Sequence, residues 1–143
     1  MGPSDGGFTL LEMLAVLAVL GLALGLVLWR GPMRSPALEA RVAADSFAQA
    51  LRAARAQAIS EGRPVSFVLD VRKHEYGTEG ASPQSLPIAP TVTISASVTG
   101  IRFAPDGSSS GGRIVFEDGG HAVSVNVGWL TGRVTTTHKD RWG

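Results

Sequence analysis

A single acidic residue, Glu12, lies near the start of a long apolar run. Between Phe8 and Trp29 it is the only charged side chain, and the pair Gly6-Gly7 precedes the run. A carboxylate at the centre of a membrane-spanning helix costs about 2.5–3.5 kcal/mol, and less near an end, so such residues usually have a function. Glu12 is therefore a candidate functional residue. The alternative is an acid that only extends to the membrane interface.

The apolar run itself has the length of a membrane span. Its 22 residues would form a helix about 33 Å long, which matches a hydrocarbon core of about 30 Å. Trp29 and Arg30 are residue types suited to the far interface. Two alternatives remain open. A cleaved secretory signal usually has a basic first region, which residues 1–7 lack. An ordinary single-span anchor would tolerate Glu12 near its edge.

The segment from Gly6 to Glu12, Gly-Gly-Phe-Thr-Leu-Leu-Glu, resembles the N-terminus of type IV pilins and type II pseudopilins. The resemblance implies that a prepilin peptidase cuts between Gly7 and Phe8 and that the new amine of Phe8 is methylated. Glu12 then lies four residues beyond that amine, or one helical turn. The two groups can neutralise each other within one chain, or they can pair between neighbouring subunits of a filament.

A second helix is predicted from about Pro36 to Glu61. Ser35 and Pro36 favour its start, and Gly62 followed by Pro64 favours its end. An apolar stripe at helical spacing should form its buried face, with Leu38 and Val42 leading into Phe47, Leu51, Ala54 and Ala58. Because the stripe is rich in alanine, this face is flat and can approach a sheet closely.

Beyond Gly62 the period of the apolar residues changes to two, which predicts strands. They are expected at 65–70, 91–98, 101–103, 113–117, 121–127 and 133–137. Asp118-Gly119-Gly120 is typical of a tight hairpin. Residues 73–90 are predicted to be an irregular loop or a hairpin flap, and 138–143 a frayed, basic tail. The predicted fold class is α+β, with a long N-terminal helix packed on an antiparallel sheet or sandwich.

Three C-terminal segments narrow the resemblance to the minor pseudopilin group called GspH, together with its FimT pilin relatives. They are residues 103–116, the hairpin 118–127, and 128–134. The most specific stretch is F-x-P-D-G-S-x-x-G-G, whose fixed positions are Phe103, Pro105, Asp106, Gly107, Gly111 and Gly112. These residues are interpreted as a structural turn, in which Asp106 and the serines form hydrogen bonds with the local backbone.

The resemblance implies a pilin-like fold, no enzymatic activity and no cofactor. It divides the chain into a leader peptide (1–7), a transmembrane helix with the methylation motif (8–30), the periplasmic half of the helix (31–62) and a β-rich periplasmic domain (63–143). The expected location is the inner membrane, and after assembly a pseudopilus, at or near its tip. The implied partners are other minor pseudopilins, the major pseudopilin, the prepilin peptidase and N-methyltransferase, the inner-membrane assembly platform and membrane lipid.

The orientation of the span is the one point at which charge and resemblance differ. Asp5 stands where such leaders usually carry a basic residue, and Arg30 and Arg34 lie beyond the run. The rule that cations stay in the cytoplasm would place the N-terminus outside, whereas the resemblance places it inside.

A second function stays open, namely that of a FimT-like minor pilin that binds DNA for uptake. Arg133, Lys139 and Arg141 near the C-terminus could contact phosphates, although such a basic tail is more often simply solvated. The net charge of +1 favours no class of partner, and the absence of cysteine excludes disulfides and thiolate metal sites. His74, His121 and His138 lack the spacing of metal ligands.

Overall fold

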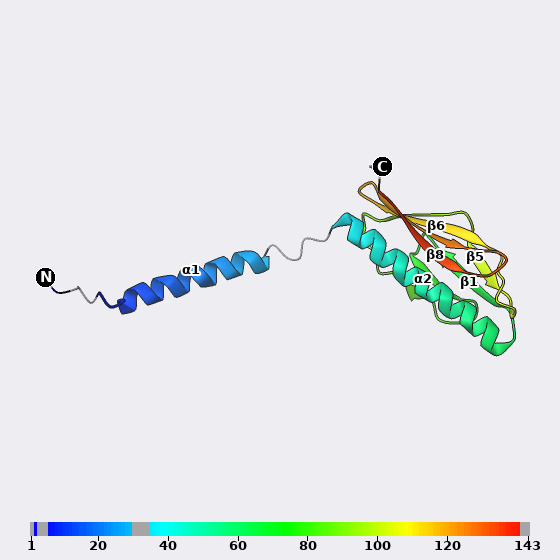
Figure 1. Ribbon diagram of the computed structural model, residues 1–143, viewed down its shortest axis with the longest axis horizontal. Helices are drawn as coiled ribbons and strands as arrows, with labels where there is room; N and C mark the ends of the chain where they lie inside the picture. Colours follow the sequence, from blue (N-terminus) through cyan, green and yellow to red (C-terminus); the bar gives the residue numbers. More distant parts are fainter. Residues whose placement is uncertain (1, 3–5, 30–34, 141–143) are drawn as a thin grey trace. The chain divides into compact units, whose positions relative to one another are not determined.

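A computed structural model of the chain describes residues 2, 6–29 and 35–140, and the chain divides into the units Met1–Met33 and Arg34–Gly143 (Figure 1). The first unit contains one helix, α1 (Leu10–Trp29). This helix begins two residues later than the apolar run, because Thr9 caps it. The hydroxyl of Thr9 accepts a hydrogen bond from the backbone N–H of Glu12 at 3.2 Å, and this satisfies one of the free donors of the first turn.

The second unit begins with α2 (Pro36–Glu61), as predicted. Ser35 precedes it with an extended backbone but without a side-chain cap, and its carbonyl oxygen accepts hydrogen bonds from the N–H groups of Leu38 and Glu39. The helix ends at Glu61. The next residue, Gly62, has a φ of 62°, the left-handed conformation that glycine adopts most easily.

The predicted stripe on α2 is only partly right. Phe47 and Leu51 are buried, and so are the alanines Ala40, Ala43, Ala44, Ala48, Ala54 and Ala58. Leu38 and Val42 are not part of this face, since their side chains are 54% and 45% exposed. At 3.6 residues per turn, Leu38 lies about 180° and Val42 about 140° around the helix from Phe47. The prediction was wrong for these two residues because it followed hydrophobicity where the helical angle required alanine.

Within residues 35–140 eight strands follow α2 and form two antiparallel sheets. The first sheet has the order β3-β2-β1-β5, with β1 at Val65–Asp70, β2 at Glu75–Thr78, β3 at Gln84–Ser85 and β5 at Gly100–Phe103. The second has the order β4-β6-β7-β8, with β4 at Thr93–Ala96, β6 at Gly112–Asp118, β7 at His121–Val127 and β8 at Val134–Asp140. This is the α+β architecture predicted from the sequence, with α2 as the helix that packs on the strands (Figure 1).

The region 73–90 contains a short hairpin rather than only a loop. Strands β2 and β3 pair through Glu75 with Ser85 and through Tyr76 with Gln84. Leu86 closes the hairpin, since its backbone N–H donates to the carbonyl oxygen of His74 and its side chain is only 5% exposed. The hairpin flap considered from the sequence is therefore confirmed.

The last strand is longer than predicted. Strand β8 continues through His138 and Lys139, which pair with Val123 and Ala122 of β7. The interpretation of residues from 138 onward as a frayed tail was wrong up to Asp140, because β7 offers pairing partners along its whole length. Residues 141–143 lie outside the described part of the chain.

Phe47 of α2 joins the helix to both sheets. Its ring centroid lies 5.4 Å from that of Phe67 in β1 and 5.6 Å from that of Phe116 in β6. Tyr76 of β2 completes the cluster at 5.8 Å. Such edge-on and tilted contacts add about 0.5–1.5 kcal/mol per pair beyond the area that they bury. The core of the second unit therefore centres on one aromatic side chain of α2.

Candidate functional sites at the N-terminal segment and the glycine–arginine junction

Gly7 and Phe8, the residues predicted for processing, lie in an exposed segment before α1. Gly7 and Phe8 have no regular secondary structure, and the Phe8 side chain is 77% exposed. A protease must bind its substrate in an extended form, so this segment is accessible as a cleavage site. In the uncut chain Phe8 lies outside the helix. The one-turn relationship between the Phe8 amine and Glu12 was predicted for a chain cut after Gly7, and it stays a prediction.

Helix α1 has the length and composition of a membrane span. Its 20 residues include one charged side chain, and none of them is buried within the described unit. Glu12 lies in its first turn, where an acidic side chain favours the helix dipole. A helix that is apolar on all sides needs a lipid or protein environment, and Glu12 is the one charged group that it carries there.

The loop between β5 and β6 holds the family motif, and it is built as a structural turn. Pro105 occupies the second position of a turn in which Gly107 N–H donates to the carbonyl oxygen of Ala104 at 2.9 Å. The carboxylate of Asp106 accepts hydrogen bonds from the backbone N–H and the hydroxyl of Ser108, at 2.9 and 2.6 Å. These hydrogen bonds hold the pKa of Asp106 below its ordinary value of 3.8, and the bond from the Ser108 hydroxyl has the largest effect.

The two ends of this motif are anchored on either side. Phe103 is fully buried and pairs with Val65 of β1. Gly111 and Gly112 have φ values of 73° and 159°, and Gly112 opens β6. A Cβ at Gly111 would lie 3.2 Å from the Cβ of Trp129, so the motif needs glycine where it meets the next loop.

The loop between β7 and β8, residues 128–133, packs directly against the motif. The backbone N–H of Ser109 donates to the carbonyl oxygen of Trp129 at 2.8 Å, and the Ser109 hydroxyl donates to the carbonyl oxygen of Gly128 at 3.0 Å. The backbone N–H of Gly132 donates to the carbonyl oxygen of Gly128 at 2.8 Å and closes this loop, and Gly132 has a φ of 61°. Two sequence segments that the resemblance identified separately are therefore one structural unit.

Arg55 of α2 joins both loops to the helix. Its Nε–H donates to the carbonyl oxygen of Gly107 at 3.0 Å. A Cβ added at Gly107 would lie 2.9 Å from one Nη of Arg55, and one added at Gly132 would lie 2.8 Å from the Nε and collide with the Gly107 oxygen. Both glycines have positive φ, and a Cβ would meet backbone at Gly132 and would require Arg55 to move at Gly107. We call the contact among Arg55, Gly107 and Gly132 the glycine–arginine junction.

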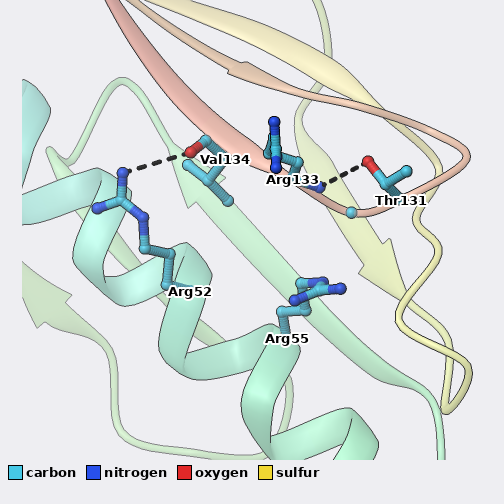
Figure 2. Close-up of a pocket in the computed structure, with 6 residues that line it drawn as sticks. Arg52, Arg55, Thr131, Arg133 and Val134 are labelled. Carbon is cyan, nitrogen blue, oxygen red and sulfur yellow. Dashed lines mark hydrogen bonds between the residues drawn. The ribbon is translucent and has the colours of Figure 1, made fainter.

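An open pocket of about 410 Å³ lies beside this junction. It is lined by Arg52, Arg55, Thr131, Gly132, Arg133 and Val134. Figure 2 shows Arg52 reaching from α2 to the first residue of β8, where it donates to the carbonyl oxygen of Val134 at 3.3 Å. The figure also shows the backbone N–H of Arg133 donating to the hydroxyl of Thr131, at 3.3 Å. Three arginines therefore line one pocket.

The proposed nucleic-acid residues do not come together. Arg133 lines the pocket, whereas Lys139 lies six residues further along β8, about 20 Å away at the rise of a strand. Arg141 lies outside the described residues.

Sequence reasoning missed Arg52 and Arg55, because arginines on the polar face of a helix give no signal of a tertiary contact. The cap at Thr9 was readable from the Thr-x-x-Glu spacing before an apolar run.

An apolar N-terminal helix, followed by a helix packed on two antiparallel sheets, defines a pilin-like protein. Comparison with known proteins gives the family: the sequence profile described as Type II transport protein GspH matches residues 43–131, and the prokaryotic N-terminal methylation motif matches residues 3–28. The chain belongs to the GspH family. Type II secretion system protein H of Xanthomonas campestris pv. campestris is 33% identical over 136 residues, which cover 90% of this chain and 80% of that protein.

Solved structures share the fold. The minor pseudopilin EpsH from the type 2 secretion system of Vibrio cholerae matches with a TM-score of 0.54 and 14% identity, over 73% of this chain and 99% of that one. The type IV minor pilin FimU of Pseudomonas aeruginosa matches with a TM-score of 0.57 and 18% identity, over 69% of this chain and 88% of that one. At these identities the likeness establishes the pilin-like α+β fold alone.

Proposed function

We propose that this chain is a structural minor pseudopilin of a type II secretion system. The observation that carries the proposal is the 33% identity with type II secretion system protein H, which covers 90% of this chain and so includes both units. The described structure supports a structural role, because its motif residues form turns and packing contacts. The chain would act as a subunit without enzymatic activity, at or near the tip of the pseudopilus, and would help export folded proteins across the outer membrane.

Processing would precede assembly. The match to the N-terminal methylation motif and the exposed segment around Gly7 support cleavage between Gly7 and Phe8, followed by methylation of Phe8. The prepilin peptidase and its N-methyltransferase activity are the implied partners at this step. Before extraction by the assembly platform, residues 8–30 would span the inner membrane, with residues 31–62 and the β-rich domain 63–143 in the periplasm.

Assembly would then replace lipid around α1 with helices of the major pseudopilin and of other minor pseudopilins. Helix α1 is apolar on all sides, so it can exchange lipid contact for packing without exposing a polar face. Glu12 would be the exception. After cleavage its carboxylate can pair with the amine of Phe8, in its own chain or in a neighbour, and the pair has no net charge inside the apolar core of the filament.

The mass of the intact protein from native membranes tests processing. A chain that starts at N-methylated Phe8 supports the proposal, whereas a full-length chain, or one cut near Ala23–Trp29, contradicts it. Deletion of the gene in the native host tests the role. Loss of type II substrates from the medium with normal DNA uptake supports a pseudopilin. The reverse result would instead assign the chain to the DNA-binding minor pilins.

A further inference from the structure

The pocket beside the glycine–arginine junction carries positive charge that the described part of the second unit does not neutralise. Within residues 35–140 Arg41 pairs with Asp45 and Arg63 pairs with Glu61, both away from this pocket. None of the pocket arginines, Arg52, Arg55 and Arg133, has a carboxylate within 4.0 Å among these residues. Arg52 and Arg55 are three residues apart on α2, so they are neighbours on the helix surface, where like charges destabilise by a few tenths of a kcal/mol.

Two of the three guanidinium groups are already held in place. Arg55 uses its Nε–H for Gly107, and Arg52 uses one Nη for Val134. Among the described residues no further hydrogen bond occupies the other side-chain N–H groups of these two arginines, and both residues line the pocket. Both hydrogen bonds are partly buried. A ligand that binds here has little side-chain freedom to remove, which favours affinity. The groups present are N–H donors with a planar fork, and this geometry matches a carboxylate or a phosphate.

An exposed apolar pair lies on the same loop as Arg133. Trp129 and Leu130 are 69% and 66% exposed. The backbone of Trp129 is fixed, because its carbonyl oxygen accepts the hydrogen bond from Ser109. Exposed Trp beside Arg is the composition that protein interfaces favour. The surface thus combines arginines of α2 and of this loop with an apolar contact on the same loop.

A protein carboxylate fits this surface better than a nucleic acid does. A nucleic-acid backbone repeats its charge and needs a track of cations. From Arg133 the next cation along β8 is Lys139, and the residues between them are Val134, Thr135, Thr136, Thr137 and His138. The charge is compact rather than extended. We propose that the pocket formed by Arg52, Arg55 and Arg133 binds an acidic side chain of a partner protein, with Trp129 and Leu130 contacting an adjacent apolar residue of that partner. The inference does not depend on the secretion role.

The test uses the full chain in non-ionic maltoside micelles, which carry no phosphate. The probe is the blocked tripeptide acetyl-Leu-Glu-Leu-amide, and the control peptide has Gln in place of Glu. NMR follows the Nε–H signals of the pocket arginines and the indole N–H of Trp129. We expect both sets to shift and saturate with the Glu peptide and to stay unchanged with the Gln peptide.

Arg133→Gln is the informative variant, because no side-chain hydrogen bond of Arg133 holds the fold among the described residues. It should weaken binding of the Glu peptide about tenfold, the effect of one charge-assisted hydrogen bond. Arg63→Gln, which removes an arginine paired elsewhere, should leave binding unchanged. Equal shifts with both peptides, or none with either, would overturn the proposal. Stronger binding of inorganic phosphate or of a short thymidine oligonucleotide would also overturn it and assign the pocket to phosphates.

Discussion

The Nε–H of Arg55 donates a 3.0 Å hydrogen bond to the carbonyl oxygen of Gly107, and this bond ties the middle of α2 to the loop between β5 and β6. Gly132 of the next loop packs on the same guanidinium group. Segments more than fifty residues apart in the sequence therefore meet at one side chain. Gly107 and Gly132 are explained by this meeting, since a Cβ at either position would displace Arg55 or the backbone.

Gly132→Ala should destabilise the fold more than its backbone conformation alone requires. An L residue with φ near 60° costs about 1–2 kcal/mol, and crowding against Gly107 and Arg55 should add about 1–3 kcal/mol. Gly62→Ala is a matched control, because Gly62 has a φ of 62° and no atom within 4 Å of an added Cβ. Denaturant unfolding of the full chain in detergent, followed by circular dichroism, measures both. Equal losses in the two variants would show that the crowding has no energetic effect.

Arg55→Lys should loosen the two loops without unfolding the domain. Lysine keeps the charge but has no Nε–H donor and no fork, so the hydrogen bond to Gly107 is lost, at a cost of about 1 kcal/mol. Hydrogen exchange at the amides of Gly107 and Gly132 should accelerate by about fivefold. Arg41→Lys on the same helix is the control, because its exposed ion pair contributes little. Unchanged hydrogen exchange in Arg55→Lys would show that Arg55 does not stabilise the two loops.

The arrangement of the helix shows what a sequence can and cannot predict. The bounds of α2, the alternation along β1 and the Gly119-Gly120 hairpin follow from local rules, and all three are confirmed. The buried face of α2 was misjudged at Leu38 and Val42. The hydrophobic pattern gave more weight to these larger residues than to the alanines that are buried on α2, although the close approach of the sheets requires small side chains.

The junction could not be predicted for a different reason. Gly107 was recognised only as a turn residue and Gly132 only as part of the segment 128–134, because local patterns do not predict the partner across the fold. Arg55 is separated from Gly107 and Gly132 along the chain, and charge on a helix surface is the default expectation. The extent of β8 depended on the length of β7 opposite it, which is also a tertiary property. In each case the missing information was which segments lie side by side.

The pKa of Asp106 predicts an acid-dependent loss of stability. Because the Ser108 hydroxyl and backbone N–H lower this pKa in the folded state, the ionised carboxylate favours folding. Its contribution is complete above the unfolded value of about 3.9 and is lost as the pH falls through the folded value. Carbon-13 NMR should place the midpoint of Asp106 below 3.8. In Ser108→Ala the midpoint should move upward, and a midpoint unaffected by this change would contradict the assigned cause.

Gly7→Ala should block removal of the leader. The peptidase is expected to require a residue without a side chain at the cut, and Gly7 lies in an exposed segment where the substitution affects no packing, since no atom lies within 4 Å of an added Cβ. The mass of the protein from native membranes should then be that of the full chain, with at least about tenfold less mature protein. Gly2→Ala, also in open space, is the control and should be processed normally. Mature protein at the wild-type level in Gly7→Ala would place the cut elsewhere.

Glu12→Ala should leave cleavage intact and impair assembly. The start of α1 does not depend on the Glu12 side chain, because Thr9 is bonded to the backbone N–H of residue 12, which alanine retains. The variant should therefore span the membrane and be cut after Gly7, but the amine of Phe8 would have no carboxylate to neutralise it among apolar helices. An uncompensated charge in that environment costs a few kcal/mol, enough to lower incorporation at least tenfold. The measurement is the amount of this subunit in sheared pseudopili, with Glu12→Gln separating charge from shape. If Glu12→Gln assembles normally, hydrogen bonding suffices and charge pairing with the amine is not required.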